Sequence, residues 1–206
     1  MSFFSRSTAR TRSSERSVFS LVEATEHPAI QALPDAFVRF MRDACRLPLD
    51  AFHALPGASL PAVARRLLDH RRDMTSTLAD FHGSALRVEI LNVAVTEEYY
   101  LREVFLRTTA TDRVVEYGVL AVALAAFTTT QRAELTAGRT PLGAILHQFE
   151  IPFVSAPLGF FTVPASLLPS IPLPSPAAHQ GCGRFNCLAK PSGEPLAWIL
   201  EILPPS

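Results

Sequence analysis

The last third of the sequence contains the stretch that decides the fold class. Residues 185–203 read FNCLAKPSGEPLAWILEIL. Two apolar runs, residues 185–190 and 195–203, flank a short polar segment centred on Ser192 and Gly193. Runs of this length and composition on either side of a glycine-containing turn predict a β-hairpin. We therefore expect two antiparallel strands here.

Further strands and several helices are predicted upstream of this hairpin. Apolar and polar residues alternate from Leu86 to Ile90, and strands are also expected at residues 99–106, 114–127 and 151–163. Helical spacing or start signals predict helices at residues 28–45, 59–70, 73–81, 129–136 and 140–148. Helices first and hairpin-connected strands later indicate an α+β fold, a single domain in which helices flank an antiparallel sheet.

Composition bounds the organisation and the class of protein. The chain has 206 residues and a formal net charge of +0, so no overall field attracts it to nucleic acid or acidic lipid. Residues 1–25 are rich in Arg and Ser and predict a disordered tail or an organellar transit peptide, ahead of a domain at residues 26–206. No apolar run is long enough to predict a membrane span. We expect a cytoplasmic protein, with a monomer favoured.

The cysteines predict neither a disulfide framework nor a metal centre. Cys45, Cys182 and Cys187 are an odd number without a secretory signal, which favours reduced thiols. Cys182, Cys187 and the nearby His179 would need a fourth ligand to hold zinc, and usually a closer pair. We expect no metal and no cofactor.

Arg102 is the first candidate for a binding residue. On a strand it shares one face with Tyr100, Val104 and Leu106, so a guanidinium would lie on an otherwise apolar face. A buried arginine needs a partner. Either an internal ion pair or the carboxylate of a ligand satisfies this need, and the local sequence does not choose between them.

Glu201 presents the complementary problem. Its strand is apolar on both faces, and burial raises the pKa of a carboxyl group toward the range useful in acid–base catalysis. The alternative is a structural role as the partner of a buried arginine, with Arg102 as one candidate.

Two helix starts could bind an anion through free backbone N–H groups. One is Asp73-Met74-Thr75. The other is Thr140-Pro141-Leu142-Gly143, in which Thr140 is the expected N-cap.

Taken together, these segments resemble the bacterial chorismate lyases from about residue 60 onward. The matching pieces, in order, are Asp73-Met74-Thr75, Leu101-Arg102-Glu103-Val104, residues 138–143 (GRTPLG), and residues 193–196 (GEPL) through 201–204 (EILP). The resemblance implies a cofactor-free enzyme of ubiquinone or secondary-metabolite biosynthesis that converts chorismate to 4-hydroxybenzoate and pyruvate. It also implies that Met74, Arg102, Leu142 and Glu201 contact the ligand. Arg102 and Glu201 would be catalytic, with Glu201 as the acid–base group.

The sequence departs from the family at Val119, where the resemblance implies an arginine beside Gly118. Arg184 could replace this cation or could be a surface charge. An enzyme of the same scaffold acting on another chorismate-derived or aromatic acid is therefore an alternative. A non-catalytic domain that senses aromatic acids is another.

Overall fold

The computed structural model describes residues 26–167 and 180–205. The predicted tail at residues 1–25, His179 and most of the proline-rich segment that follows Pro164 lie outside these described residues.

Seven strands form one antiparallel sheet in the order β1-β5-β6-β7-β4-β3-β2. The strands are β1 (His53–Leu55), β2 (Leu86–Val95), β3 (Tyr99–Thr108), β4 (Val114–Ala123), β5 (Val154–Pro164), β6 (Gln180–Ala189) and β7 (Pro195–Leu203). The α+β class and the single domain are confirmed. The β6–β7 hairpin is also confirmed, and it turns where Gly193, at φ 91°, donates its N–H to Lys190 O at 2.8 Å. This φ lies in the left-handed region that favours glycine.

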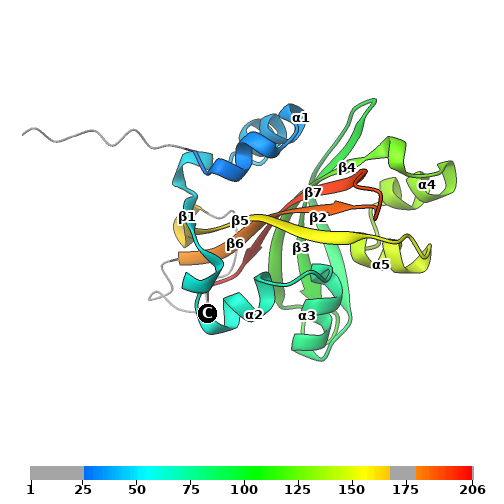
Figure 1. Cartoon of the computed structure of the whole chain (residues 1–206). Coiled ribbons are helices and arrows are strands. Elements are labelled where there is room, and N and C mark those ends of the chain that lie inside the picture. Colours follow the sequence, from blue (N-terminus) through cyan, green and yellow to red (C-terminus); the bar gives the residue numbers. More distant parts are fainter. Residues whose placement is uncertain (1–25, 168–179, 206) are drawn as a thin grey trace, which may run out of the picture.

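Helices cover both faces of the sheet. One face carries the 3-10 turn η1 (Pro28–Ala32), α1 (Asp35–Arg39) and the π-helical turn η2 (Phe40–Ala44). The other carries α2 (Ala62–Leu68), α3 (Met74–His82), α4 (Thr129–Ala137) and α5 (Leu142–Gln148). Figure 1 shows α1 and α3 on opposite sides of the sheet. β7 lies between β6 and β4 and is covered on both faces, which explains its continuous apolar sequence.

Two helix predictions were wrong in detail, and proline explains both. The single helix expected at residues 28–45 is interrupted at Leu33, which is extended at φ −93° and ψ 149° ahead of Pro34. Ser59 does not cap α2, because Leu60 is extended ahead of Pro61 and Pro61 itself is the N-cap. In each case the proline ring disfavours the helical conformation of the residue before it.

The predicted helix at residues 73–81 is confirmed. The Asp73 carboxylate accepts a hydrogen bond from Ser76 N, and Gly83 ends α3 in the left-handed conformation at φ 59°. Among the described residues, no helix has the length and apolarity needed to cross a bilayer.

The packing of α1 on the sheet generates a stability prediction. Phe37 on α1 is fully buried in the cluster formed with β3, β4 and β7. Phe37→Ala should lower the free energy of unfolding by about 3–5 kcal/mol, because it removes apolar contacts and leaves a cavity. Val63→Ala is the control, since Val63 on α2 is 53% exposed and its loss should change stability by less than about 1 kcal/mol. Denaturant unfolding measures both, and equal values would show that α1 does not pack as described.

Candidate functional site

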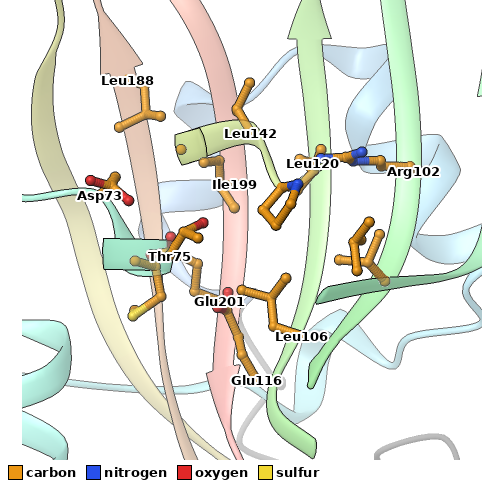
Figure 2. Close-up of a pocket in the computed structure, with 15 residues that line it drawn as sticks. Asp73, Thr75, Arg102, Leu106, Glu116, Leu120, Leu142, Leu188, Ile199 and Glu201 are labelled. Carbon is orange, nitrogen blue, oxygen red and sulfur yellow. The ribbon is translucent and has the colours of Figure 1, made fainter. Parts of the chain in front are cut away.

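A pocket lies between the sheet and the N-terminal ends of α3 and α5 (Figure 2). The empty space in and above it, including space that is open to solvent, is about 460 Å³. The residues that line it are Asp73, Met74, Thr75, Val88, Arg102, Val104, Leu106, Glu116, Leu120, Pro141, Leu142, Gly143, Leu188, Ile199 and Glu201. The four site residues predicted from the sequence, Met74, Arg102, Leu142 and Glu201, are all among them. They come from α3, β3, α5 and β7, so only the tertiary fold brings them together.

Strand register places the charged groups at two ends of the pocket floor. Arg102 on β3 pairs with Leu120 on β4, while Leu106, four residues further along β3, pairs with Glu116. Four residues of strand span roughly 13 Å. Figure 2 shows Arg102 on one side of the pocket and Glu116 with Glu201 on another. The pocket floor therefore has Arg102 at one end and the carboxyl groups of Glu116 and Glu201 at the other, with an apolar stretch between them.

Arg102 is a buried cation that no carboxylate neutralises within the described part of the chain. It is 1% exposed, and its two terminal nitrogens each donate to Thr140 O at 3.4 Å. Its Nε is buried and has no partner among the described residues, and its guanidinium lies 5.9 Å from the Tyr100 ring centroid. Burial lowers the pKa of Arg102 from its ordinary value. Two long hydrogen bonds compensate a buried charge poorly. The Arg102 guanidinium could therefore bind an anionic ligand in the pocket.

Glu201 does have a structural partner, but it is Arg184 and not Arg102. Arg184 on β6 donates through Nε to the Glu201 carboxylate, and both side chains are buried. Its Nη1 also donates to Leu68 O at 2.6 Å and to His70 O at 3.1 Å. The interpretation of Arg184 as a surface charge was therefore wrong. It is fully buried, and it ties the end of α2 to the sheet.

Glu116 is a pocket residue that the sequence prediction missed. It is 4% exposed, and its Oε2 is buried without a partner in the described residues. Burial raises the pKa of Glu116 well above its ordinary value, and the nearby charge of Glu201 raises it further. The sequence did carry a signal, since Glu116 is an acid within the apolar run of residues 114–124.

The two helix starts differ in how they are capped. The Asp73 carboxylate accepts from Ser76 N at 2.7 Å and lies 3.0 Å from His147 Nε2. Burial opposes ionisation of Asp73, but these hydrogen bonds outweigh it and lower the pKa. Met74 and Leu142 are the first residues of α3 and α5, so backbone N–H groups without intrahelical acceptors lie at the pocket wall.

Thr140 does not cap α5 as predicted. Pro141 is itself extended at ψ 145° and is the N-cap, and the Thr140 hydroxyl instead donates to Glu134 Oε1 at 2.7 Å. No side chain caps α5.

Val119 lies on the opposite face of the sheet, buried in the cluster that packs against α1. Neighbouring strand residues point to opposite faces, so Val119 is directed away from a pocket lined by Leu120. Its identity therefore says nothing about the ligand. Cys182 and Cys187 are half-buried on β6, where burial raises the pKa of both thiols.

No family model matches the chain, and no curated protein matches it either.

The buried pair of Arg184 and Glu201 generates a prediction about stability. Arg184→Met should lower the free energy of unfolding by about 3–5 kcal/mol, because it leaves Glu201 as an uncompensated buried charge. Lys190→Met is the control, since Lys190 pairs with Glu194 at the partly exposed hairpin turn. That change should cost less than about 1 kcal/mol. Chemical denaturation at neutral pH measures both, and a mild effect at Arg184 would contradict the role given to the buried pair.

Proposed function

We propose that the protein is a cytoplasmic lyase that converts chorismate to 4-hydroxybenzoate and pyruvate. The observation that carries the proposal is the convergence of Met74, Arg102, Leu142 and Glu201 on one pocket. The resemblance of short sequence motifs to chorismate lyases singles out these four residues, and they lie on four separate elements of the fold.

The chemistry of the pocket suits a ring that carries a carboxylate. Arg102 offers a planar fork for bidentate contact with the ring carboxylate. The backbone N–H groups of Met74 and Leu142 would bind further ligand oxygens. The ring would rest on the apolar floor, which includes Leu120 and Ile199.

The reaction is an elimination that needs a proton acceptor and a way to hold the substrate. The ring loses the hydrogen beside its hydroxyl group and the enolpyruvyl ether leaves, which makes the ring aromatic. There is no net oxidation or reduction, so no redox cofactor is required. Glu201 lies at the end of the floor opposite Arg102 and would act as the acid–base group.

One observation favours a second candidate, an enzyme of the same scaffold that acts on a different aromatic acid. Chorismate has two carboxylates, whereas Arg102 is the one lining arginine that the described residues leave without a carboxylate. A substrate with one carboxylate would match the single arginine that is left to bind it. A non-catalytic sensor would bind such an acid without releasing pyruvate.

Turnover distinguishes these candidates. Purified protein mixed with chorismate should release equal amounts of pyruvate and 4-hydroxybenzoate, with no added metal or cofactor and with chelator present. Chromatography identifies the hydroxybenzoate isomer, and heat-denatured protein corrects for spontaneous decay. Binding of 4-hydroxybenzoate without pyruvate would contradict the lyase, and loss of activity with chelator that zinc restores would show a metal enzyme.

Arg102 should dominate ligand affinity. Arg102→Ala should weaken 4-hydroxybenzoate binding by about 2–4 kcal/mol, or roughly 30- to 700-fold, because a charge-assisted contact with a buried guanidinium is lost. Arg102→Lys should restore little of this loss, since lysine lacks the planar fork. Arg107→Ala is the matched control, because Arg107 lies on the same strand, pairs with Glu89 and does not line the pocket. Calorimetry measures the affinities, and a folded Arg102→Ala variant that binds normally would move the site elsewhere.

A further inference from the structure

The register of the central strands places Glu116 and Glu201 diagonally across from each other on one face of the sheet. Gly118 on β4 pairs with Glu201 on β7, and Glu116 is two residues from Gly118 on the same face. A side chain at position 118 would meet Glu116, because an added Cβ would lie 3.4 Å from Glu116 Oε1 and 3.3 Å from Val104 Cγ2. Position 118 is therefore within contact distance of the Glu116 carboxyl group on the pocket face.

The charges around Glu116 do not balance if both carboxyl groups are ionised. The charged groups that act on it are Glu201 on β7, Arg184 on β6 and Asp73 at the start of α3. Arg184 is the one cation among these, and it already donates to Glu201. Burial and a neighbouring like charge both disfavour the ionised form of a carboxyl group, so the neutral form of Glu116 is favoured. The direction of the Glu116 pKa shift agrees, because burial and Glu201 both raise it.

A buried carboxyl oxygen without a partner is unusual in a protein core. Glu116 Oε2 is such an atom among the described residues, and the side chain lines the pocket. Glu103 provides the contrast, since it is also buried in this sheet but accepts a hydrogen bond from the Tyr117 hydroxyl at 2.6 Å on the opposite face. A purely structural carboxyl group resembles Glu103, whereas Glu116 has hydrogen-bonding capacity left for a ligand.

We propose that Glu116 is a second catalytic residue, a neutral carboxylic acid that protonates the leaving ether oxygen while Glu201 accepts the ring proton. The proposal rests on the lyase function proposed above.

The proton balance of this step closes within the pair. The ring C–H bond breaks and its proton goes to the Glu201 carboxylate, while its electrons form the new ring double bond. The ring C–O bond breaks, and the ether oxygen takes the proton of Glu116 and leaves as enolpyruvate. Glu201 then returns a proton to Glu116 across the pair. Enolpyruvate becomes pyruvate by gaining a proton at its methylene carbon and losing one from its hydroxyl group.

Glu116→Gln tests the acid role directly, with chorismate as substrate. Glutamine keeps the shape and the hydrogen bonding but carries no transferable acid proton. Turnover should fall about 10²–10⁴-fold, with 4-hydroxybenzoate affinity changed much less. Wild-type activity should decline at high pH, where Glu116 ionises. The residual activity of the variant should not show this decline. Glu103→Gln is the matched control and should retain turnover.

Thermal unfolding at several pH values tests, independently of activity, whether Glu116 is protonated in the folded protein. A carboxyl group whose pKa is raised by folding contributes stability below its unfolded pKa, and this contribution is lost as pH rises toward the folded pKa. The melting temperature of Glu116→Gln relative to wild type should therefore increase from pH 4 to pH 8.

The outcomes separate two kinds of failure. Wild-type protein that releases no pyruvate from chorismate overturns the lyase function and the acid role with it. Active wild type together with a Glu116→Gln variant of normal turnover overturns the acid role alone. If the difference in melting temperature between Glu116→Gln and wild type does not grow with pH, Glu116 is ionised in the folded protein, which also overturns the acid role.

Discussion

The ion pair of Arg184 and Glu201 is the interaction on which the rest of this structure depends. β7 is covered on both faces, so an acid on it needs a buried cation, and the neighbouring β6 supplies one. The same guanidinium binds the carbonyl oxygens of Leu68 and His70. This contact fixes the end of α2, and Asp73 at the start of α3 follows His70 by three residues. Arg184, on the sheet that forms the pocket floor, thus helps to position α3, which forms part of the pocket wall.

Local sequence predicted those features whose causes are local. The turn at Gly193 and the helix from Asp73 to Gly83 each depend on residues a few positions apart, and both were correct. The partner of Glu201 could not be predicted, because it depends on register between strands and not on proximity in sequence. The start of α5 was misplaced by one residue, since Pro141 is extended and caps the helix itself, while the Thr140 hydroxyl is bonded to Glu134, a contact that depends on the packing of α4 near α5. The position of Glu116 in the pocket likewise depends on the register of β4 between β3 and β7.

The pocket separates two kinds of polar environment along one apolar floor. Arg102 offers a charge that the described residues leave largely uncompensated, whereas at the other end Glu201 is paired with Arg184 and the pKa of Glu116 is raised. A ligand with one anionic end and one neutral polar end would therefore bind in a single orientation. α3 and α5 approach each other closely above this floor, and glycine at position 143 leaves room for the capping carboxylate of α3, because an added Cβ would lie 2.3 Å from Asp73 Oδ1.

The pairing of β4 with β7 joins two meanders, β2-β3-β4 and β5-β6-β7, that are each continuous in sequence. Arg102 and Glu116 belong to the first meander, and Arg184 and Glu201 to the second. During synthesis the first meander emerges before its partner exists, with β4 as an unpaired apolar edge and Glu116 without the neighbouring charges of Arg184 and Glu201. Such an edge is prone to pair with other chains. The joining of the two meanders is a long-range and therefore slow contact, so the interval before it forms is when this chain is most exposed to aggregation.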